Sequence, residues 1–105
     1  MEFQELINRA RAIRKSYSAK EKEQYGSSWT SEEIALGFVG DVGDLAKLII
    51  AENGKRNIPN SKEKLGHELS DCLWSIIVLA DLHGINLEKV FMNTMDEIEK
   101  HSIES

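Results

Sequence analysis

Four acidic residues interrupt two stretches of the chain that are otherwise apolar, and they form the set best suited to chemistry. The four residues are Asp41, Asp44, Glu68 and Asp71. The first two lie within residues 34–50 and the last two within residues 65–74. In an α-helix, a spacing of three residues places both members of a pair on one face, about one turn apart. Each stretch therefore predicts concentrated negative charge on a helix whose other residues favour burial.

The two pairs predict a metal site if their helices pack side by side. Four converging carboxylates would repel one another and would lose hydration, and a divalent cation relieves both penalties. Oxygen ligands suit Mg²⁺ or Mn²⁺ better than zinc, and Mg²⁺ in proteins commonly also binds substrate phosphates. The residues alone thus point to metal-assisted phosphate chemistry. For either pair taken singly, an ordinary solvated acidic face remains the alternative.

Helical periodicity runs through the whole chain, and alternation typical of a strand does not hold over even four residues. The spacing of apolar residues predicts four helices, covering 2–24, 30–52, 61–82 and 87–101. The segment Thr30-Ser31-Glu32-Glu33 has the pattern of a capping box, and Asn53-Gly54 is typical of a helix end. Asn60 and Asn86 are candidate caps of the last two helices.

Four helices joined by short loops predict an all-α fold, an antiparallel four-helix bundle that forms a single domain over residues 1–105. The helix that contains residues 34–50 is apolar on nearly every side, so we expect it to be largely buried. Gly40 and Gly43 would allow another helix or a ligand to approach it closely. Such a chain exposes more apolar surface than a small monomer can hide, which predicts a homodimer or homotetramer.

Composition narrows the classes of partner. The 105-residue chain has a net charge of −5, which disfavours a nucleic acid polymer as partner. No apolar run approaches the roughly 18 residues of a membrane span, and we expect no signal peptide and no membrane partner. The single cysteine, Cys72, excludes an intramolecular disulfide and favours a cytoplasmic location.

Three motifs resemble those of one enzyme family. Residues 38–46 read FVGDVGDLA, residues 68–71 read ELSD, and residues 79–87 read LADLHGINL. In order, spacing and flanking residues they resemble the MazG-like all-α nucleoside triphosphate pyrophosphohydrolases, within the dCTP-pyrophosphatase-like branch. The resemblance covers about residues 25–92.

The resemblance implies Mg²⁺-dependent hydrolysis of a (deoxy)nucleoside triphosphate to a monophosphate and pyrophosphate, as part of nucleotide-pool house-cleaning. It also implies helical dimers or tetramers. Carried over by position, Asp41, Asp44, Glu68 and Asp71 would be the catalytic and metal-binding residues. An aromatic residue before the second helix, Tyr25 or Trp29, would stack on the base. Lys47, one turn after Asp44, would contact phosphate or form an ion pair.

Several positions depart from the family pattern. Gly40 replaces the first glutamate of the first motif, and aspartates occupy its two remaining glutamate positions. Thr94 and Ile98 stand where the branch carries a lysine and an asparagine near the nucleotide. These changes support an alternative, a catalytically weak or inactive module that binds nucleotide or a partner protein. Two further features have ordinary interpretations, with the basic stretch at 9–15 as a solvated face and Trp74 as a core or interface residue.

Overall fold

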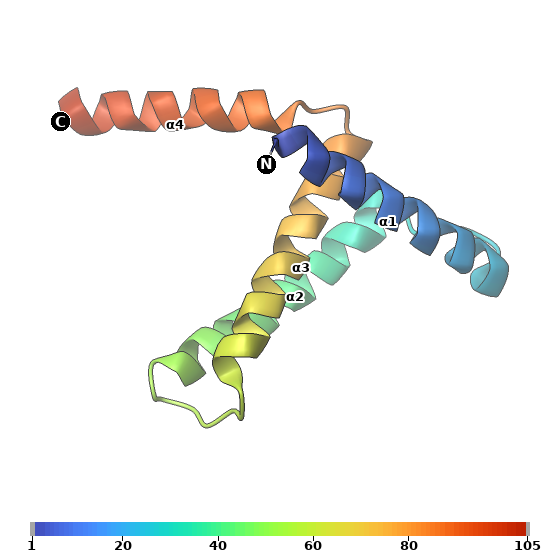
Figure 1. Cartoon of the computed structure of the whole chain (residues 1–105), viewed down its shortest axis with the longest axis horizontal. Coiled ribbons are helices and arrows are strands. Elements are labelled where there is room, and N and C mark those ends of the chain that lie inside the picture. The colour runs from blue at the N-terminus through green and yellow to red at the C-terminus, as the bar shows by residue number, and fades with distance from the viewer. Residues whose placement is uncertain (1, 105) are drawn as a thin grey trace.

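The computed structural model describes residues 2–104, and within that range it contains helices and loops but no strand (Figure 1). The helices are α1 (Phe3–Tyr25), α2 (Ser31–Glu52), α3 (Ser61–Leu82) and α4 (Leu87–Glu104). The all-α helical bundle is confirmed, and the bounds of the helices lie within three residues of the prediction. The agreement has a local cause, because residues at the helix ends set most of these bounds.

The entry to α2 shows this local control. The Thr30 hydroxyl accepts a hydrogen bond from the Glu33 N–H at 3.2 Å, and the Glu33 carboxylate accepts one from the Thr30 N–H at 3.1 Å. This reciprocal pair is the predicted capping box. At the end of α1, Gly26 adopts φ 82°, a left-handed conformation that glycine takes without strain, and its N–H donates to the Lys22 carbonyl.

The turn between α2 and α3 differs from the prediction. Asn60 occupies the cap position of α3 with φ 56°, and its side chain makes no capping hydrogen bond. The turn is instead held by Ser61, whose hydroxyl donates to the Glu52 carboxylate at 2.6 Å and so links the end of α2 to the start of α3. Asn86 behaves as predicted, since its side-chain oxygen accepts from the Lys89 N–H in the first turn of α4.

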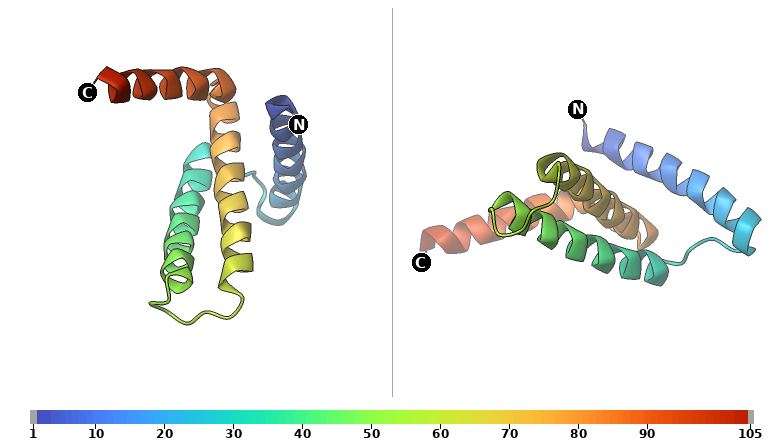
Figure 2. Two further views of the ribbon diagram at one scale, coloured as in Figure 1. Left: turned by 60° about the vertical axis from the view of Figure 1, so that its left-hand side comes forward. Right: turned by 90° about the horizontal axis from the view of Figure 1, so that it is seen from below.

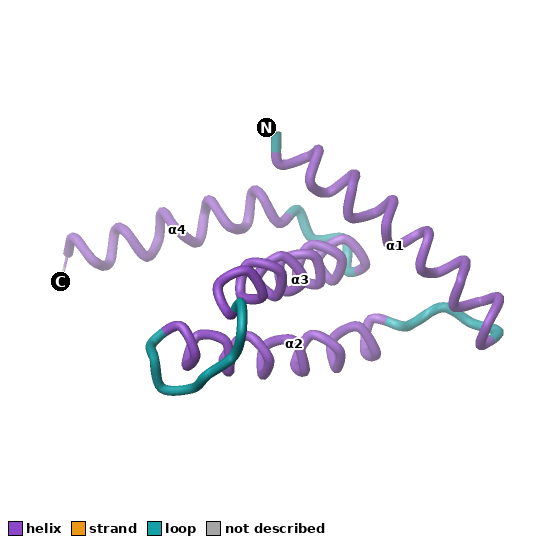
Figure 3. The backbone as a smooth tube through the Cα atoms, turned by 60° about the horizontal axis from the view of Figure 1, so that its bottom comes forward, coloured by secondary structure: helices purple, strands orange, loops and turns teal. Residues whose placement is uncertain are grey.

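Helix α3 is the central element of the chain. It packs antiparallel to α2 along most of its length, and α1 crosses its opposite side, as the views in Figures 2 and 3 show. The buried core lies where the three helices meet and consists of Ala10, Ile34, Ile77 and Val78. This arrangement places the carboxylates of α2 beside those of α3 and sets α1 at the edge of the same region.

The prediction that α2 is largely buried is wrong for a single chain. Of its apolar side chains only Ile34 and Leu48 are buried, while Leu36 and Val39 are 73% and 67% exposed. Within the described chain, no atom outside the helix lies within 4 Å of where a side chain at Gly40 or Gly43 would begin. The cause is geometric, because among residues 2–104 the one close neighbour of α2 is α3, and its outer face has no partner there.

Helix α4 contacts the end of α3 and then extends away from the other helices (Figures 1 and 2). The radius of gyration is 16.8 Å, whereas a compact domain of about 100 residues has a value of about 13 Å. The single chain is therefore open. None of the four helices is apolar over a stretch long enough to cross a membrane.

Candidate functional site

The packing of α2 against α3 brings three carboxylates together. Asp41 and Asp44 from α2 and Glu68 from α3 each offer a carboxylate oxygen, and these three oxygens lie within 4.8 Å of one another. We call this set the acidic cluster. Asp41 and Glu68 are half-buried, and Asp44 is exposed. The cluster thus has a protected side within the helix pair and an open side toward solvent.

Asp71, the fourth predicted ligand, lies beside the acidic cluster and is not part of it. Its carboxylate is 3.4 Å from Nε2 of His67, one turn earlier on α3. Three residues turn a helix by about 300°, so Asp71 lies about 60° around the axis from Glu68. That rotation explains why two residues on one broad face point to different neighbours. Its charge still reaches the cluster, where it raises the pKa of Asp41 and of Glu68.

Burial and mutual repulsion both disfavour the ionised cluster. Loss of hydration raises the pKa of Asp41, and the charges of Asp71 and Asp44 raise it further. The pKa of Glu68 is raised by burial first and then by Asp41, Asp71 and Asp44, against a smaller opposing effect of His67. The same combination, burial followed by the charge of Asp41, raises the pKa of the Cys72 thiol.

The cluster fits a divalent cation. Oxygen Oε2 of Glu68 is buried, and no described residue offers it a hydrogen bond. This is costly for a carboxylate unless another group, such as a cation, pairs with it. Opposite oxygen ligands of one Mg²⁺ lie about 4.2 Å apart, because each Mg–O distance is about 2.1 Å. A separation of up to 4.8 Å therefore needs only a small side-chain adjustment. The donor set, three carboxylates with an open side, suits an ion that keeps some water or phosphate ligands.

An aromatic cavity of about 210 Å³ adjoins the acidic cluster, between α1, α2 and α3. Asp41 belongs to both, and Tyr17, Trp29, Phe38 and Trp74 supply the aromatic walls. Tyr17 and Trp74 meet edge to face, with ring centroids 5.8 Å apart. A neighbouring open depression of about 420 Å³ shares Tyr17, Asp41 and Trp74 with this cavity and adds Asp71. Carboxylates and aromatic rings thus line one continuous region.

Two residues of α1 that the motifs do not include hold the wall of this cavity. The Arg14 guanidinium donates to the Trp29 carbonyl and, at 3.2 Å, to the Glu21 carboxylate. The same Glu21 oxygen accepts from the Trp29 N–H at 2.8 Å. We call these three residues the Arg14 clasp. The interpretation of the basic stretch as a solvated face is wrong for Arg14, whose side chain is only 14% exposed. The sequence signal for this contact is the seven-residue spacing of Arg14 and Glu21, which places them on the same face of one helix, two turns apart.

The predicted substrate-binding residues separate in space. Trp29 lines the aromatic cavity. Tyr25, the last residue of α1, is 74% exposed and does not line it. Lys47 is exposed and, within residues 2–104, forms no ion pair with Asp44 or any other group. Trp74 packs against the buried core as predicted. It also lines the cavity, and its Nε1 is buried without a partner among the described residues.

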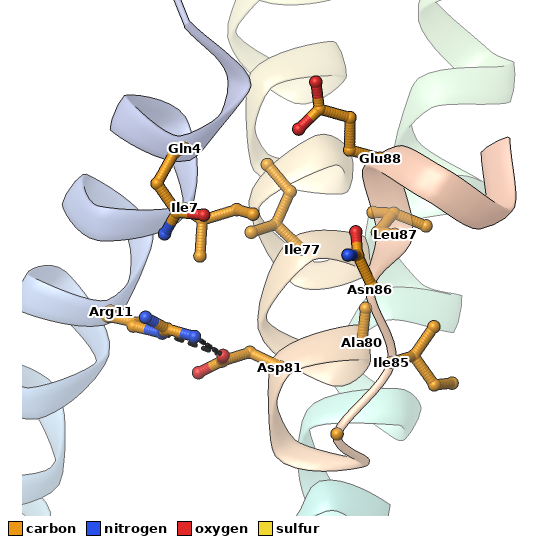
Figure 4. A pocket seen from close by; sticks show the side chains of 11 residues that line it. Gln4, Ile7, Arg11, Ile77, Ala80, Asp81, Ile85, Asn86, Leu87 and Glu88 are labelled. Atoms are coloured by element: carbon orange, nitrogen blue, oxygen red, sulfur yellow. Dashed lines mark hydrogen bonds and ion pairs between the residues drawn. The ribbon is translucent and has the colours of Figure 1, made fainter. Parts of the chain in front are cut away.

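A larger cavity, of about 380 Å³, lies elsewhere, between α1, the end of α3 and the start of α4 (Figure 4). Arg11 and Asp81 form an ion pair at its edge, in which Arg11 Nε donates to Asp81 at 2.8 Å. Its lining contains none of the predicted site residues. The Asp81 carboxylate raises the pKa of the Arg11 guanidinium, chiefly through the hydrogen bond. The pair joins α1 to α3 at the surface.

The fold and the acidic cluster define a class, an all-α helical protein with carboxylates from two antiparallel helices gathered at one point. Residues 29–102 match the family model of the MazG nucleotide pyrophosphohydrolase domain. This match covers well over half of the chain, and the chain belongs to the MazG nucleotide pyrophosphohydrolase family. A comparison with curated proteins finds no match. Helix α1, which supplies Arg14 and Glu21 of the Arg14 clasp, lies outside the matched residues.

Proposed function

We propose that this protein hydrolyses a (deoxy)nucleoside triphosphate to a nucleoside monophosphate and pyrophosphate, with Mg²⁺ or Mn²⁺ as the required ion. One observation carries the proposal. Three carboxylate oxygens within 4.8 Å of one another adjoin an aromatic cavity, and Asp41 belongs to both. Phosphates would bind near the acidic cluster, and the base would lie against Trp29 in the cavity. Membership of the family supports nucleotide pyrophosphohydrolase chemistry in general.

We assign each carboxylate a role according to its position in the site. Asp41, Asp44 and Glu68 would hold the ion, with Asp71 close enough to strengthen the negative field. When bound, the ion neutralises charge on the phosphate oxygens. One of these carboxylates would remove a proton from the attacking water. The water oxygen bonds to a phosphorus of the α–β anhydride as the bridging P–O bond breaks, and pyrophosphate leaves.

The test is pyrophosphate release from a panel of ribo- and deoxyribonucleoside triphosphates, with Mg²⁺, with Mn²⁺ and with a chelator. We expect turnover of at least one triphosphate that the chelator abolishes. Asp44→Asn removes one ligand charge and should lower the rate by about 100-fold or more. The matched control is Asp96→Asn on α4, the same chemical change outside the acidic cluster. Equal rates for the two variants would show that the cluster is not the active site.

The alternative is a module that binds nucleotide without turnover. One observation at Thr94 supports this alternative. The Thr94 hydroxyl donates a hydrogen bond to the Val90 carbonyl within its own helix, at 2.7 Å. Thr94 therefore cannot replace a lysine that contacts phosphate, and Ile98 offers no polar group. Calorimetry separates the two functions, since a module would bind triphosphates with Mg²⁺ and release no pyrophosphate from any of them.

We also propose that the working form is a homodimer or homotetramer in the cytoplasm. The outer face of α2 presents Leu36, Val39, Gly40, Gly43 and Ile50, all exposed and spaced for one side of a helix. On α4, Phe91 and Ile98 are likewise exposed, at 55% and 57%. A second copy of the chain would cover such self-complementary faces by symmetry. The free, buried Cys72 is consistent with a reducing compartment.

A further inference from the structure

Two residues that line the aromatic cavity carry buried hydrogen-bond donors that nothing within the described residues satisfies. Nε of Arg14 and Nε1 of Trp74 are both buried without a partner, and both residues line the cavity. The other two nitrogens of the Arg14 guanidinium are occupied in the Arg14 clasp. A buried donor without a partner is unfavourable, and folded proteins contain few of them. Two in one cavity indicate that something with acceptor atoms enters it.

Two carboxylates of the cavity are engaged elsewhere, whereas the hydroxyls of Tyr17 and Ser75 can donate or accept. One oxygen of Glu21 accepts from both Arg14 and Trp29, and Asp41 belongs to the acidic cluster. Neither Arg14 Nε nor Trp74 Nε1 can itself accept a hydrogen bond, because each carries its proton at neutral pH. Arg14 and Trp74 therefore contribute two donors without partners, and a ligand edge complementary to these two carries acceptors.

The size and walls of the cavity specify the shape of that ligand. Its volume of about 210 Å³ is below the range of about 300–1,000 Å³ found for pockets that hold a whole small molecule. It suits one ring, with the remainder of the ligand outside. Aromatic side chains on several sides favour a flat ring, which stacks or meets them edge on. Asp41 at its margin places the acidic cluster where the rest of the ligand would lie.

We propose that Arg14 and Trp74 determine which base the protein accepts, by donating from Arg14 Nε and Trp74 Nε1 to carbonyl oxygens or ring nitrogens on the inserted edge. This inference rests on the proposed function, which places a nucleotide at the acidic cluster. It adds a specificity-determining role for α1, a helix outside the family match. The Arg14 clasp gives Arg14 a second task, because the residue that selects the base also positions Trp29 against it.

Binding of the four common deoxynucleoside 5′-monophosphates, measured by calorimetry with Mg²⁺, tests the proposal without turnover. Ribose 5-phosphate serves as the probe that lacks a base. The wild-type protein should rank the four bases and bind ribose 5-phosphate weakest. Trp74→Phe keeps an aromatic wall and removes one donor, so it should reduce the discrimination between bases by about 3- to 10-fold. Arg14→Lys keeps the positive charge, removes the Nε–H donor, and should have a similar effect.

Trp29→Phe is the matched control. It removes an indole N–H from the same cavity, but from a residue that is 44% exposed and whose role in the proposal is stacking. It should weaken all four monophosphates to a similar extent and keep their order. A wild-type ranking that survives in both Trp74→Phe and Arg14→Lys overturns the proposal. Equal affinity for ribose 5-phosphate and the nucleotides overturns it as well.

Nuclear magnetic resonance gives a second readout that does not depend on affinity. The chain has only two tryptophans, so its indole N–H region contains two signals, which the two Phe variants assign. Binding of a preferred monophosphate should move the Trp74 signal in the direction of a new hydrogen bond, and ribose 5-phosphate should not. An unmoved Trp74 signal in the saturated complex contradicts the proposal. Absence of pyrophosphate release beside an intact base ranking would instead remove only the catalytic function.

Discussion

The ionised carboxylate of Glu68 lies in an unfavourable environment in the isolated chain. One of its oxygens is buried without a partner among the described residues, and burial and then three neighbouring carboxylates raise its pKa. Such an arrangement lowers stability unless a ligand compensates for it. Residues that serve a site often carry this kind of penalty, since the geometry that binds the ligand is unfavourable without it.

Glu68→Gln should therefore separate stability from function. Removal of the charge relieves repulsion, and the melting temperature of the metal-free protein should rise by about 2–4 °C. The rise that Mg²⁺ produces in the wild type should disappear, because a ligand charge is gone. Thermal denaturation with and without Mg²⁺ measures both effects. Glu63→Gln, on the same helix but outside the acidic cluster, should keep the Mg²⁺ response; its loss there would argue against the assignment.

The raised pKa values of Asp41 and Glu68 also predict a dependence on pH. Protonated forms of these carboxyls are favoured by folding, so their stabilising contribution is present below the unfolded values of about 4 and is lost as pH rises through the raised folded values. Bound Mg²⁺ needs the ionised forms and competes with protons. Melting curves should thus show a Mg²⁺-induced increase that is larger near about pH 8 than near about pH 5. An increase that is constant with pH would contradict this coupling.

At the scale of elements, the entry to α2 connects stability with the cavity. The Thr30 capping box fixes the first turn of α2 directly after Trp29. Thr30→Ala should cost about 1 kcal/mol. It should also weaken nucleotide binding, because the position of Trp29 becomes less defined. Denaturant unfolding and calorimetry measure the two effects, and Thr30→Ser, which keeps the hydroxyl, should restore both. A Thr30→Ala variant with wild-type affinity would show that the Arg14 clasp alone is sufficient to hold Trp29.

The elements also show what the sequence could predict. The helix ends could be predicted because Thr30, Gly26 and Asn86 set them through local hydrogen bonds and local backbone conformation. The carboxylate pairs could be predicted as site residues because acidic side chains are unfavourable in helices that are otherwise apolar. The Arg14 clasp was not, since it depends on how the chain returns from α1 to Trp29. The displacement of Asp71 from the cluster depends on the rotation of α3 against α2, which motif spacing does not specify.

For the whole molecule, the outer face of α2 gives the sharpest test of assembly. Leu36 is 73% exposed in the single chain, where a substitution to lysine would change stability little. If that face contacts a second copy, Leu36→Lys should dissociate the oligomer and lower the melting temperature. Light scattering after size-exclusion chromatography measures the mass. Ala19→Lys, on an exposed position of α1, is the comparison and should keep the wild-type mass. A wild-type protein that is monomeric at all concentrations would refute the proposed assembly.

The extension of α4 away from its own chain has a consequence for dynamics. Only the start of this 18-residue helix packs on α3, and helices in proteins owe most of their stability to tertiary packing. Its order would then depend on a neighbour and not on the chain that encodes it. Amide hydrogens in the second half of α4 should exchange rapidly in dilute protein and slowly in concentrated protein, whereas those of α3 should change little. The outer half of α4 would thus acquire its structure only where enough copies are present to share it.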